Sequence, residues 1–360
     1  MRIAQVAPLI ESVPPKHYGG TERIVSYLTE ELVRAGHDVT LFASGDSVTS
    51  AELVPVCRRS FRQNKRAKDY LSREVLLMDH VMQRAGEFDV VHFHTGCLHY
   101  LISRHLAVPH VTTLHGRLDT TELLRLYERF RDMPMISISN SQRTPWPCAN
   151  WQATIYHGLP KDLFRFYPEP GNYLAFLGRV SPEKRVDRAI EIAKRVGMPL
   201  KIAAKVDPAD RRYFKREIEP LLNDPHIEWV GEISDKDKDG FLGNAYALLF
   251  PIDWPEPFGL VMIESMACGT PIIAYECGSV PEVMEDGVTG FVVRDLDDAV
   301  KGVNRIRELS RSRCREVFER RFAADRMASD YIDVYKRLVG NDLDRTPPDM
   351  STPQPALVTA

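Results

Sequence analysis

Short runs of apolar residues alternate with amphipathic segments along most of the chain. An amphipathic segment at 21–35, which Gly36 ends, separates the first two runs. Apolar runs that are separated by helices are typical of parallel strands covered on both faces. The expected strands are RIAQVA (2–7), VTLFAS (39–44), FDVVHFH (88–94), PHVTTLH (109–115) and MISISN (135–140), then YLAFLGR (173–179), LKIAAKV (200–206), HIEWVG (226–231), AYALLFP (245–251) and TPIIAY (270–275).

A proline-rich stretch at 159–172 separates the first five of these runs from the second five. The pattern therefore predicts an α/β protein with two doubly wound, Rossmann-like domains, divided near 160–172. Ligands of such sheets bind at the carboxyl ends of the strands, so we expect the site in the loops that follow them. The last segment, 341–360, carries four prolines and no periodicity and is predicted to be disordered.

The amino-acid composition of the chain limits the classes of function that are expected. The 360 residues are enough for two domains, and the net charge of −3 gives no reason to expect a nucleic-acid partner. The six cysteines form no CxxC pair, which indicates free thiols in a reducing compartment. The N-terminus lacks the features of a signal peptide, and no apolar run approaches the ~18 residues of a membrane span. We expect a cytoplasmic protein, which would touch a membrane only peripherally, at its inner face.

The stretch WPEPFGLVMIESMACGTP (254–271) places a carboxylate among apolar residues. A helix is expected between Gly259 and Gly269, and Glu264 shares a face of it with Leu260 and Ala267. A buried carboxylate requires a partner. The ordinary partner is a backbone N–H or a distant arginine, and the alternative is a ligand diol such as that of ribose. Glu256 lies in the loop before the same helix, whose free N–H groups favour an anion.

Two further loops carry candidate phosphate contacts. Gly19 and Gly20 precede a helix, where the backbone can approach a ligand closely, although the same pair is also common in plain turns. The pattern is not GxGxxG, so a nicotinamide site is not expected. Arg179 ends a strand and Lys184 lies in the first turn of the next helix, where a cation opposes the helix dipole. A bound diphosphate would resolve that conflict, and the alternative is that both charges are merely solvated.

Histidines cluster in the first domain, at 92, 94, 99, 105, 110 and 115. No acidic residue or cysteine accompanies them at ligand spacing, so we expect no metal site. His115 ends a strand at the expected ligand edge, where it could donate a hydrogen bond to a substrate. The alternative is a structural histidine.

Several of these loops together resemble a known family. YGGTER (18–23), TLHG (113–116), FLGRVSPEKR (176–185) and, above all, PEPFGLVMIESMACGTPIIAYECGSVPEVMEDGVTGFVV (255–293) are similar to the retaining glycosyltransferases of family four, which have the GT-B fold. The resemblance extends over about residues 1–340. It implies two Rossmann-like domains facing a cleft, an N-terminal acceptor-side domain at 1–160 and a nucleotide-sugar-binding domain at 161–321. The resemblance also implies that a crossover helix at 322–338 returns to the first domain.

The resemblance assigns roles to individual residues. Glu256 would face the donor sugar, Glu264 would hold the ribose hydroxyls, and His115 would lie near the donor sugar. The basic pair Arg179 and Lys184 would neutralise the leaving diphosphate. The remaining substrate contacts are expected from Gly19, Gly20, Phe258, Gly259 and Leu260 around the diphosphate and from Glu232 and Ile233 beside the base. At two places near the expected nucleotide position the sequence differs from the family pattern. Arg185 occupies a position where the family often has glycine, and AAKV (203–206) lacks the usual Gly-x-Gly.

The expected function is therefore a retaining, metal-independent hexosyl transfer from a nucleotide diphosphate sugar, UDP- or GDP-linked, to an acceptor hydroxyl. The acceptor is a sugar, a small molecule or a lipid-linked compound, and no cofactor is expected besides the donor substrate. The alternative is a catalytically silent sensor or scaffold that keeps the nucleotide-sugar pocket. A sugar-nucleotide epimerase shares the architecture but lacks the paired glutamates.

The segment CRRSFRQNKRAK (57–68) carries six cations and no acid. A solvated loop is the ordinary interpretation, and the alternative is contact with anionic lipid headgroups or an acidic acceptor.

Overall fold

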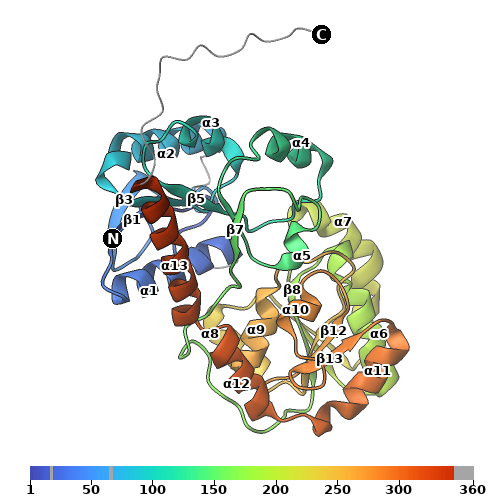
Figure 1. Ribbon diagram of the computed structural model, residues 1–360. Helices are drawn as coiled ribbons and strands as arrows, with labels where there is room; N and C mark the ends of the chain where they lie inside the picture. The colour runs from blue at the N-terminus through green and yellow to red at the C-terminus, as the bar shows by residue number, and fades with distance from the viewer. Residues whose placement is uncertain (17–18, 65–67, 344–360) are drawn as a thin grey trace.

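The computed structural model describes residues 1–16, 19–64 and 68–343, with side chains to Gly340. Its core is two parallel sheets, which lie apart in Figure 1. The first sheet has the order β3-β2-β1-β4-β5-β6-β7, and the second has the order β10-β9-β8-β11-β12-β13. Every strand pair in both sheets is parallel, which confirms the predicted pair of doubly wound units.

The first unit contains the strands β1 (Arg2–Val6), β2 (Asp38–Ser44), β3 (Glu52–Cys57), β4 (Val90–Phe93), β5 (His110–Thr113), β6 (Met135–Ser137) and β7 (Trp151–Thr154). Its helices are α1 (Gly20–Arg34), α2 (Leu71–Arg84), α3 (Tyr100–Ser103), α4 (Thr121–Arg129) and α5 (Asn140–Arg143). The strand order reverses between β1 and β4, and a crevice opens at such a switch point beyond the carboxyl ends of the strands.

The second unit contains β8 (Leu174–Arg179), β9 (Leu200–Lys205), β10 (Ile227–Gly231), β11 (Ala247–Phe250), β12 (Ile272–Tyr275) and β13 (Gly290–Val293). Its helices are α6 (Val186–Val196), α7 (Arg211–Tyr213), α8 (Asp235–Gly243), α9 (Leu260–Ala267), α10 (Val280–Val283), α11 (Leu296–Arg305) and α12 (Arg311–Arg321). Here the order reverses between β8 and β11. The loops after these two strands carry the FLGRVSPEKR and PEPFG segments.

Three strands were absent from the sequence prediction: β3, β7 and β13. Each is the edge strand of its sheet. Residues of β3 and β7 are half-buried or exposed, and β3 contains a proline, so neither shows the continuous apolar run of a central strand. β13 has only four residues and begins with glycine.

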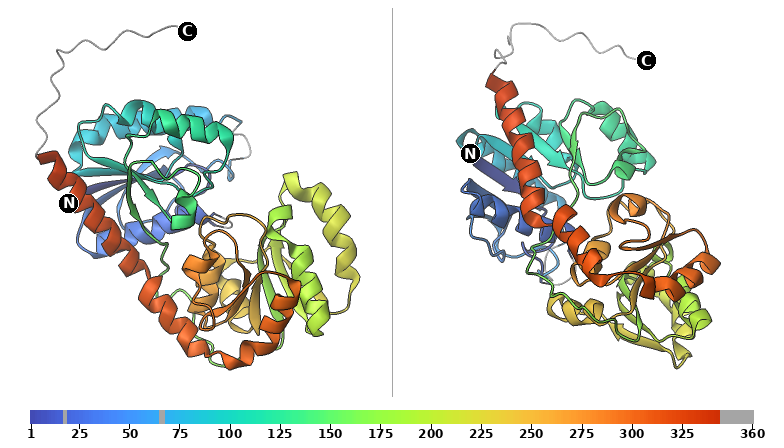
Figure 2. Two further views of the ribbon diagram at one scale, coloured as in Figure 1. Left: turned by 45° about the vertical axis from the view of Figure 1, so that its right-hand side comes forward. Right: turned by 60° about the horizontal axis from the view of Figure 1, so that its bottom comes forward.

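The last helix, α13 (Ala324–Leu343), returns to the first unit and packs against α1 and β4. Figure 2 shows α12 and α13 following one another along one side of the molecule. A buried apolar cluster continues from the first sheet through α13 and the connecting segment into the second unit.

The chain crosses between the units twice, and the two crossings lie side by side. The Leu159 N–H donates to the Phe322 carbonyl at 2.9 Å, and the Ala324 N–H donates to the Leu159 carbonyl at 2.9 Å. A Cβ at Gly158 would lie 2.5 Å from the Ala323 carbonyl oxygen, so only glycine permits this approach. All strands of the first sheet precede this region and all strands of the second follow it. The domain boundary between residues 160 and 161 stays a prediction.

The crossover helix is longer than the 322–338 expected. It continues to Leu343, so the predicted disorder is wrong for 341–343, and residues 344–360 lie outside the described residues. The prolines on which the disorder prediction depended begin only at Pro347, so no proline interrupts the helix up to Leu343.

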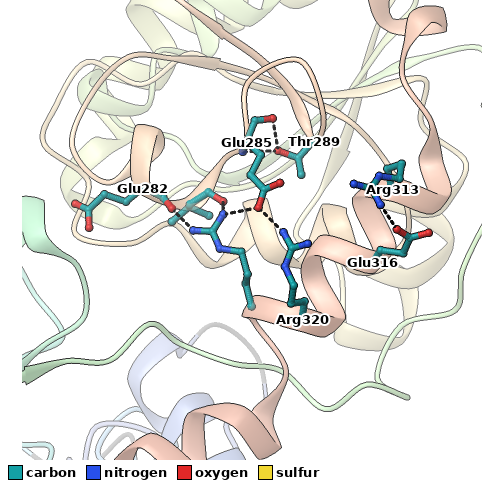
Figure 3. A network of polar contacts seen from close by, with 8 residues as sticks. Glu282, Glu285, Thr289, Arg313, Glu316 and Arg320 are labelled. Atoms are coloured by element: carbon teal, nitrogen blue, oxygen red, sulfur yellow. Dashed lines mark hydrogen bonds and ion pairs between the residues drawn. The ribbon is translucent and has the colours of Figure 1, made fainter.

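Ion pairs attach α12 to the loop after α10 (Figure 3). Glu285 accepts from Arg320 at 2.7 Å and from Arg321 at 3.2 Å. The neighbouring Glu282 instead contacts the first unit, where its carboxylate accepts from the backbone N–H groups of Asn140 at 2.7 Å and Ser141 at 2.6 Å. These contacts join the second unit to the first at a point away from α13.

Candidate active site

A cavity of about 460 Å³ has walls from both units. It lies at the carboxyl ends of the strands, where parallel sheets bind ligands. The lining includes every residue that the sequence singled out for the site, namely His115, Arg179, Lys184, Glu256, Gly19, Gly20, Glu232, Ile233, Phe258, Gly259, Leu260 and Glu264. The structure thus brings all twelve together around one space. The AAKV segment, which departs from the family pattern, also lines the cavity, through Ala203, Ala204 and Lys205.

Lys184 and Glu256 meet at the second unit's switch point. Lys184 ends a short 3₁₀ turn before α6, and its ammonium group forms an ion pair with the Glu256 carboxylate. The Lys184 nitrogen also lies 5.2 Å from the ring centroid of Trp254, whose Nε1–H donates to the same Glu256 oxygen at 3.1 Å. Both charged side chains are mostly buried, so the pair is strong and an incoming anion would compete with Glu256 for the lysine.

Arg179 ends β8 on the same wall. Its guanidinium donates to Glu183 at 2.8 Å and to Asp210 at 3.1 Å. These two carboxylates orient the arginine while leaving it 31% exposed. Arg179 is therefore held in place at the cavity rather than merely solvated.

Glu264 is buried on α9, as its apolar neighbours predicted, with only 4% of its surface exposed. Its carboxylate accepts from the Lys238 ammonium at 2.9 Å. The hydrogen-bond partner of Glu264 is thus a lysine from α8, which the sequence did not suggest, and the buried Arg23 interacts electrostatically with the same carboxylate. Lys238 also lies 3.4 Å from Asp235, which in turn pairs with the buried Arg23 of α1. The cluster therefore joins both units next to the cavity.

The glycine loops form the narrow parts of the wall. α1 begins at Gly20, and a Cβ there would lie 3.6 Å from the Leu260 side chain, so the two units approach closely at this point. Gly259 has φ +81°, and a Cβ would lie 2.8 Å from the Met262 side chain. Glycine is favoured at 259 chiefly by this conformation, because the end of the flexible Met262 side chain could shift. The helix start that it allows at Leu260 places amide groups at the cavity edge.

Arg185 stands where the family often has glycine, and the structure gives the reason for that glycine. The backbone of Arg185 has φ +53° and ψ +53°, a left-handed conformation that residues other than glycine rarely adopt. Hydrogen bonds from its guanidinium to Asp187, at 2.8 Å, and to Asp253, at 2.8 Å, accompany this backbone. The departure therefore changes the side chain beside the site while the backbone turn is kept.

The histidines form a buried network of hydrogen bonds. His94 Nδ1 lies 2.9 Å from His115 Nε2, and His92 Nδ1 lies 2.6 Å from the Tyr335 hydroxyl of α13. No group of His, Cys, Asp or Glu suited to a metal ion occurs within the parts of the chain that the structure describes. His157, from the segment after β7, stacks on His115 with ring centroids 5.2 Å apart and also lines the cavity.

Burial lowers the pKa of these histidines. The pKa values of His92, His94 and His157 lie well below the usual range, and that of His99 falls to about 3, in each case chiefly because charged imidazolium is poorly solvated in the interior. In the unfolded chain each of these histidines would have a pKa of about 6.5. Below that pH the unfolded chain binds more protons than the folded one, so stability rises with pH.

We therefore expect the free energy of unfolding to fall in mild acid. Each of these four histidines, and likewise His115, whose pKa burial lowers to about 3, should contribute a loss of about 1.4 kcal/mol between about pH 7.5 and pH 5.5. Urea unfolding at the two pH values measures the difference. Equal free energies of unfolding would show that the histidines are not held neutral in the folded protein.

Sequence reasoning missed several residues that line the cavity: Arg23, Glu22, Arg62, His157, Asp235 and Lys238. Glu22 and Arg23 stand two and three positions after Gly20, and this proximity was a signal that could have identified them. Lys238 and Asp235 belong to a strongly charged helix that resembles a solvated surface segment in sequence. Only the packing of α8 beside α9 brings them to the site.

Comparison with known proteins supports the same family over most of the chain. Residues 164–321 match the model of "Glycosyl transferases group 1", and residues 18–155 match that of "Glycosyltransferase Family 4". The chain is 25% identical to the alpha-maltose-1-phosphate synthase of Mycolicibacterium smegmatis, over 82% of this chain and 86% of the relative. It is 26% identical to the phosphatidyl-myo-inositol mannosyltransferase of the same organism, over 83% of this chain and 82% of the relative.

Solved structures agree on the fold. The crystal structure of Anabaena HepE in complex with UDP matches 94% of this chain and 100% of its own, with a TM-score of 0.73 and 18% sequence identity. The GT-B architecture expected from the sequence is thereby confirmed. With both domain models matched and all the expected residues around one cavity, the chain belongs to the family-four glycosyltransferases, which have the GT-B fold and transfer sugars from nucleotide-sugar donors.

Proposed function

We propose that this protein transfers a hexosyl group from a UDP- or GDP-linked sugar to an acceptor hydroxyl, with retention of configuration and without a metal ion. One observation carries the proposal: two cations, two glutamates and two helix starts from both units line a single cavity. The name of the mannosyltransferase relative supports a hexosyl group, and the UDP bound by HepE supports a nucleoside diphosphate.

The donor would bind along the cavity. Glu264 would accept hydrogen bonds from the ribose diol, and the diphosphate would lie near Arg179, Lys184 and the start of α9. Glu264 also accepts from the Lys238 ammonium, and its two carboxylate oxygens have enough acceptor sites for both hydroxyls as well. Glu232 and Ile233, at the end of β10, would border the base.

In the proposed reaction the bond between the anomeric carbon and the diphosphate oxygen breaks, and its electron pair stays on the diphosphate. The acceptor oxygen forms the new bond on the same face of the sugar, and its proton passes to the leaving phosphate. Charge therefore develops on the diphosphate while the sugar becomes oxocarbenium-like. Lys184 and Arg179 are placed to stabilise that charge, which is why no metal ion is needed in this proposal.

Donor turnover tests the proposal. The protein would be incubated with UDP-glucose, GDP-mannose and ADP-glucose, and release of the nucleoside diphosphate would be followed without added acceptor. Slow hydrolysis of one donor, with the α-anomer as the first product seen by NMR, is expected. Binding of a donor without any turnover, even with candidate acceptors, would favour the silent sensor or scaffold.

We also propose a peripheral contact between the 57–68 region and anionic lipid. Arg58 and Arg59 are exposed, and the helix that follows, α2, exposes Leu71 (58%), Val75 (53%) and Leu76 (51%). Residues 65–67 lie outside the described residues. Cations beside exposed apolar side chains suit an anionic membrane surface. No helix within the described parts of the chain is long and apolar enough to cross a membrane.

Vesicle sedimentation tests this contact. We expect the protein to sediment with vesicles that contain phosphatidylglycerol at low salt and to be released at high salt, because the attraction is screened. Val75→Asp should weaken the binding, whereas His105→Asn, at an exposed position on another segment, should not. Equal recovery with anionic and neutral vesicles at low salt would remove the lipid proposal.

A further inference from the structure

A chain of buried hydrogen bonds leads from α13 to the cavity. It begins at Tyr335 and continues through Gln5 and His94 to His115, whose ring lines the cavity. Tyr335, Gln5 and His94 are all at most 3% exposed. Water is therefore excluded from this part of the chain, and each group must find its partners within it.

The Tyr335 hydroxyl fixes the direction of the chain. Its oxygen accepts from the Gln5 amide, so its own hydrogen is available to His92 Nδ1, 2.6 Å away, a distance that fits an O–H donor. The Gln5 amide nitrogen lies 3.1 Å from that oxygen.

The orientation of Gln5 then fixes His94. With its NH₂ group on Tyr335, Gln5 presents its carbonyl oxygen to His94 Nε2, at 2.8 Å. A carbonyl oxygen only accepts, so His94 Nε2 carries the hydrogen. Burial keeps the pKa of His94 well below its usual value, so the ring is neutral and Nδ1 has none. Nδ1 must accept from His115 Nε2, 2.9 Å away.

His115 is thereby left with one unused atom. Its own pKa is lowered to about 3 by burial, so a ring with hydrogen on Nε2 carries a lone pair on Nδ1. His115 Nδ1 is buried and has no hydrogen-bond partner among the described residues. A buried acceptor without a partner costs free energy, which a ligand donor would recover.

We propose that Gln5 and His94 are positioning residues that hold His115 in the Nε2–H tautomer, so that its Nδ1 accepts a hydrogen bond from a substrate hydroxyl. The substrate part of this proposal rests on the proposed function. It reverses the expectation that His115 donates to the substrate. An oxygen of the diphosphate would meet a lone pair at Nδ1 and be repelled, whereas a sugar hydroxyl donates to it. The hydroxyl-bearing sugar, and not the diphosphate, therefore lies against His115.

Histidine NMR on the full-length protein tests the tautomer directly. Protein labelled with ¹⁵N-histidine is measured at neutral pH, and the His115 signals are identified by their loss in His115→Asn. The expected result is a protonated Nε2 and an unprotonated Nδ1 in the wild type. In Gln5→Leu, the His115 signals should shift toward an average of the two tautomers. A wild-type His115 protonated at Nδ1 would overturn the proposal even if Gln5→Leu failed to fold.

Tyr331→Phe is the matched control. Tyr331 is a fully buried tyrosine of the same helix, but its hydroxyl contacts Thr113 at 3.0 Å and connects only through Thr113 and His92 to Tyr335, at the end of the path farthest from His115. It should leave the His115 tautomer unchanged. An unchanged His115 tautomer in a folded Gln5→Leu would also overturn the proposal, because a merely structural Gln5 would not set the protonation of a ring two hydrogen bonds away.

Kinetics test the substrate part separately. Gln5→Leu should lower kcat/KM for a turned-over donor, UDP-glucose or GDP-mannose, by roughly 5- to 10-fold, while the Kd for UDP or GDP stays unchanged. An equal loss for donor and nucleoside diphosphate would contradict a contact with the sugar. Absence of all donor turnover in the wild type would contradict the proposed function and the substrate hydroxyl with it, while the NMR result would still decide the roles of Gln5 and His94.

Discussion

Lys184→Ala is expected to lower kcat for the nucleotide-sugar donor roughly 10²- to 10³-fold, the usual effect of removing one preorganised group that stabilises transition-state charge. Lys184 is fixed in position by Glu256 and by the ring of Trp254. It is therefore already at the place where the leaving diphosphate would become more negative. The charge develops mainly in the transition state, so we expect kcat to fall more than the affinity for the donor.

Lys194→Ala is the control for this experiment. Lys194 is in the last turn of α6, 3.4 Å from Asp224, and does not line the cavity. It should retain the wild-type rate. Thermal unfolding of both variants checks folding, since Lys184→Ala leaves the mostly buried Glu256 without its cation. Wild-type turnover by a folded Lys184→Ala would contradict the assignment of Lys184.

Glu264→Gln is expected to weaken binding of the nucleoside diphosphate roughly 10- to 100-fold, because hydrogen bonds from the ribose diol to a charged acceptor would be lost. Glutamine keeps the shape of the side chain but offers only one acceptor oxygen. Glu264 is buried, so its contacts are shielded from water and count strongly. Isothermal titration with UDP and GDP measures the change.

A double comparison identifies the ribose as the contact. Wild type should bind 2′-deoxy-UDP or 2′-deoxy-GDP more weakly than the ribonucleotide, and Glu264→Gln should lose most of that difference, since the two changes remove the same interaction. Glu228→Gln, at an exposed glutamate paired with Lys201, serves as the control. Equal discrimination against the deoxynucleotide by wild type and Glu264→Gln would mean that Glu264 does not hold the diol.

Much of the fold could be predicted because central strands of parallel sheets are apolar on both faces. β4 and β11 are buried throughout, β1 is buried from Ile3 onward and β8 is buried in its first half, and all four lie next to the two switch points. The edge strands β3 and β7 could not be recognised in the same way, since their residues are only half-buried or exposed. Their place is fixed by pairing with a neighbour and not by their own pattern.

Those residues of the candidate site that lie at or after the ends of strands could be predicted. Arg179 ends β8 and Glu256 lies in the loop after β11, and parallel strands bring such positions to one edge. The partners of these residues were not predictable. The ion pair of Arg23 with Asp235 joins residues 212 positions apart, and it requires both units to be packed together. The same holds for Gln5 and Tyr335, which are 330 positions apart.

The most direct test of the account compares nucleosides with the same base and different numbers of phosphates. Uridine, UMP and UDP, and likewise guanosine, GMP and GDP, would be titrated against wild type and Lys184→Ala. The account predicts that one diphosphate binds wild type clearly more tightly than its monophosphate, and that Lys184→Ala loses most of this difference while the nucleoside binds as before. Equal affinity for monophosphate and diphosphate in wild type, or no binding of either base, would contradict a diphosphate site in this cavity.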